Sequence, residues 1–138
     1  MLSNENLTYN DKMSDIYKNL NSKQNIHKLG INYISNFLEQ AGFTIHEVVK
    51  SPDHHFQLLV EVSDKSMLIA VRTASYPNIG SIDKKTKKRL IKEAEQLNAI
   101  PHFAGLTIKP LEASDTELDG LPEGEKFEVI FSGISVVR

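Results

Sequence analysis

Residues 52–73 read PDHHFQLLVEVSDKSMLIAVRT, and this stretch decides the fold. Residues 56–62 and 67–73 are apolar runs rich in β-branched side chains, which is the composition of β-strands. Residues 63–66 between them are polar, as in a turn, so we predict a β-hairpin. The second run is the more apolar. We therefore expect its strand at the centre of a sheet, where both faces are shielded from water.

Helical and extended segments flank this hairpin. Apolar residues between 25 and 41 recur at helical spacing, and Gly42 follows as a residue that ends a helix. Residues 43–49 predict a first strand. A second helix is expected over residues 82–98, with Ser81 as its N-cap. We also predict three further strands, over residues 102–108, 126–130 and 134–138.

The order of these elements predicts an α/β protein with a mixed central sheet flanked by helices. The order is helix, three strands, helix and strand, followed by an acidic loop over 109–125 and a β tail. Residues 11–20 carry apolar side chains at helical spacing, so we expect a short helix within a polar N-terminal extension, residues 1–24. Residues 25–138 then form a single domain, since most domains hold roughly 100–200 residues.

Composition excludes several classes of protein. The 138 residues contain no Cys, which excludes a disulfide scaffold, a zinc ribbon and a thiol nucleophile. There is no glycine-rich phosphate loop of the GxGxxG or GxxxxGK[ST] type. The longest apolar run, residues 67–71, is far shorter than the roughly 20 residues of a membrane span. Residues 1–12 lack the features of a secretory signal, so we expect a soluble cytoplasmic protein with no membrane contact.

Charge is distributed unevenly along the chain, although the net charge is only −2. Residues 112–128 hold seven acidic side chains against Lys126 alone. Residues 84–92 hold no acid and six basic side chains: Lys84, Lys85, Lys87, Lys88, Arg89 and Lys92. A row of cations on one helix is typical of contact with a phosphate backbone, and the alternative is an ordinary solvated face.

Three features carry a resemblance to a known family: the predicted order of elements, the dipeptide Pro52-Asp53 and the tripeptide Ala70-Val71-Arg72. In these features the chain resembles the PD-(D/E)XK nuclease superfamily, whose restriction-endonuclease-like fold includes Holliday-junction resolvases. The resemblance spans residues 25–108 and also rests on residues 27–30 in the first helix and 41–43 at its end. It implies an αβββαβ core with one acid on the second strand and an acid-x-Lys triplet on the third. Those carboxylates would coordinate Mg²⁺, and the Lys would orient the attacking water.

The sequence departs from this motif at two positions. Ala70 stands where the second acid is expected, and Arg72 replaces the Lys with a permanently protonated, rigid fork. Asp53 alone remains as a metal ligand, and one carboxylate holds Mg²⁺ weakly, so we expect no cofactor. If acids have relocated, Glu61 on the second strand and Glu93 on the second helix are the candidates, and Mg²⁺ would then be bound.

Three functions stay open. The first is an inactive nuclease-like protein that binds nucleic acid or a nucleoprotein complex through a basic helix, at Lys84, Lys85, Lys88, Arg89 and Lys92. The second is a protein–protein interaction module whose working surface is the acidic segment 112–128. The third is an active Mg²⁺-dependent nuclease with relocated acids, using Asp53, Glu61 and Arg72. The oligomeric state also stays open.

Overall fold

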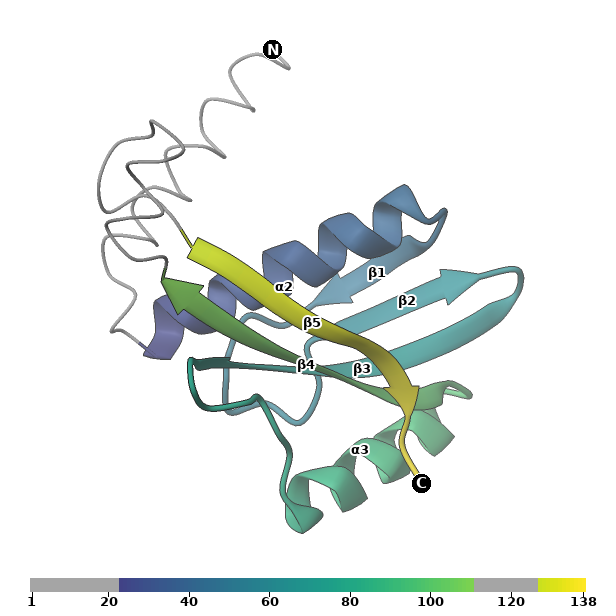
Figure 1. Cartoon of the computed structure of the whole chain (residues 1–138). Coiled ribbons are helices and arrows are strands. Elements are labelled where there is room, and N and C mark those ends of the chain that lie inside the picture. Colours follow the sequence, from purple (N-terminus) through teal and green to yellow (C-terminus); the bar gives the residue numbers. More distant parts are fainter. Residues whose placement is uncertain (1–22, 111–126) are drawn as a thin grey trace.

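A five-stranded mixed β-sheet with one helix on each face makes up the part of the chain that the computed structural model describes, residues 23–110 and 127–138 (Figure 1). The predicted helix over 11–20 and most of the acidic segment lie outside these residues. The elements are α2 (Lys23–Gln40), β1 (Thr44–Val48), β2 (Leu58–Val62), β3 (Lys65–Ser75), α3 (Lys84–Gln96), β4 (Ile100–Pro110) and β5 (Phe127–Val136).

The strands lie side by side in the order in which they occur along the chain. β1, β2 and β3 are consecutive antiparallel strands, β4 runs parallel to β3 after the α3 crossover, and β5 returns antiparallel to β4. The αβββαβ order, the central position of β3 and the entry of residues 102–108 into the same sheet are therefore confirmed. Ser63 and Asp64 form the β2–β3 turn, and both have positive φ, at 48° and 67°, as hairpin turns of two residues require.

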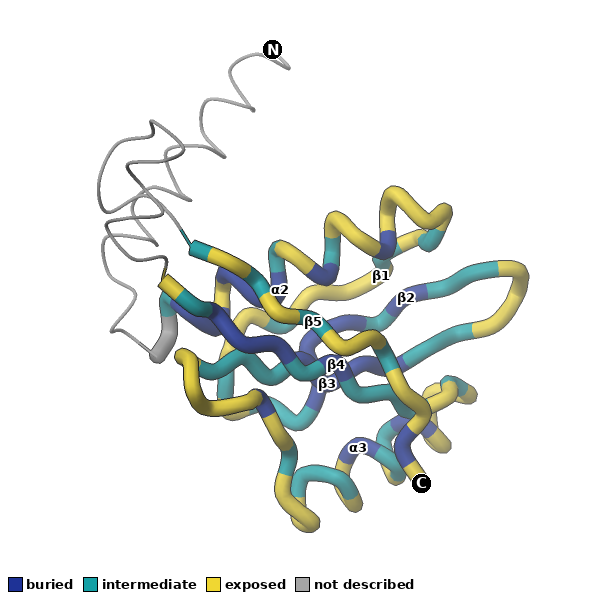
Figure 2. The backbone as a smooth tube through the Cα atoms, in the orientation of Figure 1, coloured by how far each residue is buried: buried dark blue, intermediate teal, exposed yellow. Residues whose placement is uncertain are grey.

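β3 is apolar on both sides because each of its faces is covered by a helix. Ile69 and Val71 pack in the cluster that includes Ile34 of α2. Leu68 and Ala70 alternate with them and pack with Leu90 of α3 on the opposite face. Figure 2 shows the resulting buried centre of β3 and β4, with exposed residues along α2 and β5.

The start of α3 differs from the prediction. Ser81 is not the N-cap, since the helix begins at Lys84 and Asp83 caps it, with its carboxylate accepting a hydrogen bond of 2.7 Å from the Thr86 N–H. The reason is the path of the preceding loop. Gly80 lies so close to β3 that a Cβ atom there would be 1.9 Å from the Arg72 carbonyl oxygen, so the chain is still crossing the sheet at residue 81.

The C-terminal β tail is also different from the prediction. The two short strands expected over 126–130 and 134–138 are one strand, β5. Gly133 has a φ of 107° and marks a bulge, because Ala104 pairs with Ile134 while Leu106 pairs with Phe131. The polar and glycine residues that suggested a break between two strands form this bulge, which bends the strand without ending it.

Candidate nucleic-acid interface

A polar cavity of about 380 Å³ opens between the end of β3, the loop before α3 and the first turn of α3. It brings together two of the predicted site residues, Asp53 and Arg72. Its other lining residues include Pro52, Thr73, Gly80 and Thr86. Because Thr86 belongs to the first turn of α3, the cavity adjoins the start of the basic helix.

Arg72 is half-buried in the wall of this cavity, and its hydrogen bonds are all to uncharged groups. Its Nη1 donates to Gln57 Oε1 at 2.8 Å and to the Val71 carbonyl at 3.1 Å, and its Nη2 donates to the His54 carbonyl at 3.0 Å. A guanidinium has five N–H donors, so two of them have no partner among residues 23–110 and 127–138.

The charge of Arg72 is desolvated without a bonded counter-ion. Burial lowers the pKa of Arg72, and attraction by Asp83 and then Asp53 opposes that shift. Neither carboxylate forms an ion pair with the guanidinium within the described residues. Since Arg stays protonated at any physiological pH, a fixed positive charge with two further N–H donors lines the polar cavity. That combination is suited to an anion with several oxygen atoms, such as a phosphate.

Gln57 is a site residue that the sequence reasoning missed. It immediately precedes Leu58, which pairs with Ile69, and its side chain is fully buried beside β3. Its Oε1 accepts from the Val71 N–H at 2.7 Å as well as from Arg72. Its Nε2 donates to the carbonyls of Ser51 and His54, at 3.2 Å and 2.8 Å. Gln57 therefore positions Arg72 and ties the loop before β2 to the centre of the sheet.

The residues around Arg72 do not fit a magnesium ion. Gln57, just before β2, places there an amide oxygen that already accepts two hydrogen bonds, and Ala70 of β3 carries only a methyl group. Mg²⁺ requires hard oxygen ligands, usually carboxylates and water. In the part of the chain that the structure describes, no group of three or more His, Asp or Glu side chains is placed to hold a metal ion.

Glu61 and Glu93 lie apart from the cavity. Glu61 pairs with Ser66 near the hairpin turn, about 13 Å along β2 from Gln57 at 3.3 Å per residue, and its carboxylate is 2.7 Å from His46 Nε2. Glu93 of α3 is 2.8 Å from His55 Nε2 and so joins the helix to the loop before β2. The structure brings neither acid to Asp53 and Arg72.

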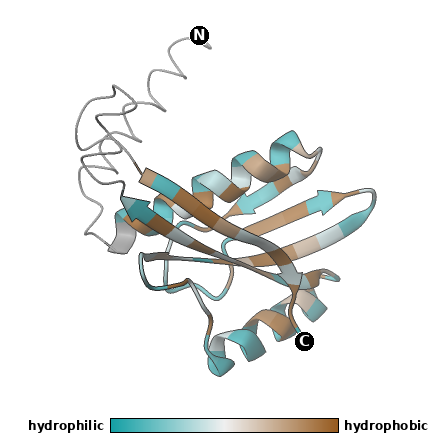
Figure 3. Ribbon diagram, viewed as in Figure 1, coloured by the Kyte–Doolittle hydropathy of each residue, from teal (hydrophilic) through white to brown (hydrophobic). Residues whose placement is uncertain are grey.

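The basic side chains of α3 form a continuous solvated surface, which we call the α3 basic face. Lys84, Lys85, Lys88, Arg89 and Lys92 are exposed, and Lys87 is half-buried. The opposite side of the helix packs on the sheet through Leu90 and Ala94. None of the six cations forms an ion pair with another described residue. Figure 3 shows the hydrophilic start of α3, where the helix dipole adds further positive potential.

Comparison with known proteins gives one family and a distant structural similarity. No curated protein matches the chain. The chain is similar to the Holliday junction resolvase of Archaeoglobus fulgidus, with 15% identity and a TM-score of 0.45 over 72% of this chain and 74% of that one. No helix among the described residues is long and apolar enough to cross a membrane. The family model described as "Domain of unknown function (DUF8840)" matches residues 24–137, so this chain belongs to that family.

Proposed function

We propose that this protein binds the phosphate backbone of nucleic acid, without cutting it, through the α3 basic face and the cavity at Arg72. The observation that carries the proposal is Arg72, a half-buried residue that lines a polar cavity and whose guanidinium is bonded only to neutral oxygens. A desolvated charge of this kind is costly unless an anion completes its shell. A phosphate provides that charge and the acceptors for both remaining N–H donors.

The α3 basic face supplies the other contacts. Its cations extend from the first turn of α3, which also lines the cavity, so one backbone can reach both. A helix presents one side to a duplex, so we expect about three phosphates to be contacted at once. The contacts involve no base edge, which makes sequence-independent binding the expected mode.

The surroundings of Arg72 support binding rather than cleavage. Hydrolysis of this kind depends on carboxylates that hold a metal ion, but Ala70 stands at the second acid position and the side chain bonded to Arg72 is the amide of Gln57. Among the residues that the structure describes, Asp53 is the one acid that lines the cavity together with Arg72.

The salt dependence of duplex DNA binding tests the role of α3. With about three phosphate contacts, the slope of log K against log salt should be near −3. Replacing Lys84, Lys88 and Lys92 together by Gln should flatten the slope toward zero and leave the melting temperature nearly unchanged, because exposed charges contribute little to folding. The matched control replaces Lys28, Lys50 and Lys65 by Gln, three exposed lysines outside α3. No binding at low salt, or an equal loss in the control, would contradict the proposal.

Inorganic phosphate tests the cavity separately from the helix. Phosphate should raise the melting temperature of the parent protein more than chloride at equal ionic strength, because a ligand that binds only the folded state stabilises it. Arg72→Met should abolish this difference, while the triple Lys→Gln variant of α3 should retain most of it. A difference that survives Arg72→Met would show that the anion binds elsewhere.

A further inference from the structure

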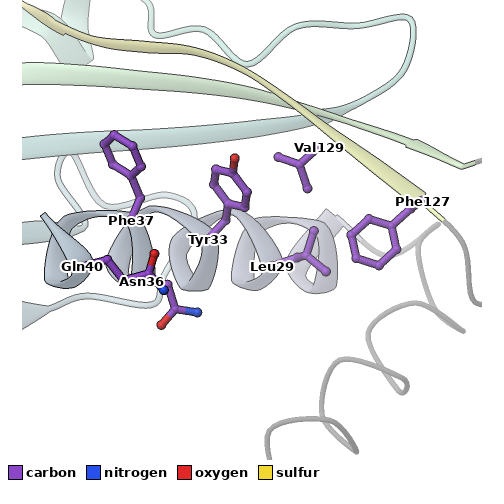
Figure 4. Close-up of a pocket in the computed structure, with 7 residues that line it drawn as sticks. All are labelled: Leu29, Tyr33, Asn36, Phe37, Gln40, Phe127 and Val129. Carbon is purple, nitrogen blue, oxygen red and sulfur yellow. The ribbon is translucent and has the colours of Figure 1, made fainter.

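The polar cavity at Arg72 is larger than one phosphate group requires. Its volume of about 380 Å³ falls within the roughly 300–1,000 Å³ of pockets that hold small organic ligands. Figure 4 shows, for comparison, the apolar groove of about 410 Å³ between α2 and β5, where none of the described lining residues is charged. Of these two cavities, the one at Arg72 is therefore suited to a charged ligand that carries further polar groups.

Asp53 is the part of this cavity that a phosphate alone does not explain. It is exposed, and within residues 23–110 and 127–138 its carboxylate forms no hydrogen bond or ion pair. Asp53 immediately precedes His54, whose carbonyl accepts the 3.0 Å hydrogen bond from Arg72 Nη2. A carboxylate repels a phosphate and accepts hydrogen bonds without donating any. The complement of Asp53 is therefore a hydrogen-bond donor, such as a hydroxyl group.

An exposed apolar side chain completes the lining. Ile79, in the loop before α3, lines the same cavity and is 73% exposed. Covering such a side chain with the carbon atoms of a ligand is favourable, because it removes apolar surface from water. The ligand should therefore combine an anion for Arg72, a hydroxyl donor for Asp53 and a carbon framework for Ile79.

We propose that the cavity holds one ribonucleotide unit of an RNA strand, with its phosphate at Arg72 and its ribose 2′-hydroxyl donating to Asp53. The 2′-hydroxyl and the 3′-phosphate are on adjacent carbons of one ribose, so a single unit offers both groups together. Acidic side chains recognise ribose 2′-hydroxyls in dinucleotide-binding proteins. The inference rests on the proposed function and adds a preference for RNA, since DNA has no 2′-hydroxyl to offset the repulsion by Asp53.

An RNA duplex of mixed sequence and the same duplex made with 2′-fluoro nucleotides test the role of the hydroxyl. The fluoro duplex keeps the backbone charge and the A-form helix but has no 2′ donor. The parent protein should bind RNA about tenfold more tightly, as one hydrogen bond to a charged group allows. Asp53→Ala should remove this difference. Fluorescence anisotropy at one fixed salt concentration measures both affinities, because such binding depends on salt.

Sulfate distinguishes a lost hydroxyl acceptor from a damaged cavity. Sulfate has oxygen acceptors for Arg72 but no hydroxyl, so Asp53 only repels it. Asp53→Ala should therefore enlarge the rise in melting temperature that sulfate produces, while it weakens the binding of RNA relative to the fluoro duplex. Glu47→Ala is the matched control, because Glu47 is an exposed acid on β1 and its loss changes the net charge equally. This control should keep the preference for RNA.

The outcomes separate this inference from the proposed function. Equal affinity of the parent for the two duplexes would overturn the inference and leave binding of the phosphate backbone standing. A preference for RNA that survives Asp53→Ala, or disappears in Glu47→Ala, would overturn it in the same way, as would a smaller response of Asp53→Ala to sulfate. Binding of neither duplex at low salt would contradict the proposed function and this inference with it.

Discussion

The side-chain oxygen of Gln57 accepts a hydrogen bond of 2.8 Å from Nη1 of Arg72. The same oxygen accepts the Val71 N–H, so one buried amide satisfies a strand backbone group and orients a charged side chain. In a buried polar network of this kind, removal of one member leaves its partners without hydrogen bonds. The geometry of Arg72, on which the proposed phosphate site rests, therefore depends on Gln57.

Gln57→Ala should destabilise the protein by about 1–3 kcal/mol, because it leaves the buried Val71 N–H without an acceptor. Urea unfolding followed by circular dichroism measures the change. Gln40→Ala is the control, since Gln40 is exposed at the end of α2 and surface changes are usually within about 0.5 kcal/mol. Equal unfolding midpoints for the two variants would contradict the structural role of Gln57.

The parent protein should not cleave linear, branched or single-stranded DNA with Mg²⁺ or Mn²⁺. The reason is that Gln57 and Ala70 provide no carboxylate beside Arg72. A gel assay with each substrate measures this directly. Cleavage that disappears in Asp53→Asn would show instead that Asp53 acts with acids elsewhere in the chain, and the relocated-acid hypothesis would replace the binding proposal.

A metal site should be recoverable at the same position. The triple variant Gln57→Glu, Ala70→Asp and Arg72→Lys places two carboxylates and a Lys on neighbouring strands, so Mg²⁺ should raise its melting temperature. Metal at 100 times its Kd corresponds to about 2.7 kcal/mol of stabilisation. The parent should show no such shift. If the triple variant is folded and Mg²⁺ does not raise its melting temperature, these positions do not converge on a metal-binding geometry.

Much of the fold could be predicted from the chain because its strands have clear composition and its helices clear spacing. Gln57 was missed because its role depends on the hairpin register. The two-residue turn pairs Leu58 with Ile69, whereas a turn using all of residues 63–66 would pair Leu58 with Val71 and place Gln57 opposite Arg72 instead of Ala70. Side-chain spacing along a strand is the same in both registers, so periodicity does not distinguish them.

The start of α3 was mispredicted for a different reason. Ser81 and Asp83 are both good N-cap residues, so local propensity does not choose between them. The choice comes from a tertiary contact, since Gly80 lies against the Arg72 carbonyl and donates its N–H to the Leu106 carbonyl at 3.3 Å. These contacts hold the chain on the sheet until the helix begins.

The cap at Asp83 should give α3 a stability that depends on pH. The hydrogen bond from the Thr86 backbone N–H, above all, lowers the pKa of Asp83 from its ordinary value of 3.8. Because the pKa in the folded state is below that in the unfolded state, the carboxylate stabilises the fold fully above pH 3.8, and this stabilisation is lost as the pH falls through the lower folded value. Asp83→Ala should therefore lower the melting temperature at neutral pH, and its difference from the parent should shrink in acid.

Two further variants separate the charge of the cap from its hydrogen bond. Asp83→Asn keeps an oxygen acceptor for the Thr86 N–H, so it should retain most of the melting temperature at neutral pH without the acid-dependent change. Ser81→Ala should leave the melting temperature unchanged at every pH, because Ser81 precedes the cap. Differential scanning calorimetry between acid and neutral pH distinguishes these cases. A larger loss in Ser81→Ala than in Asp83→Ala would place the start of α3 two residues earlier, as the sequence alone predicts.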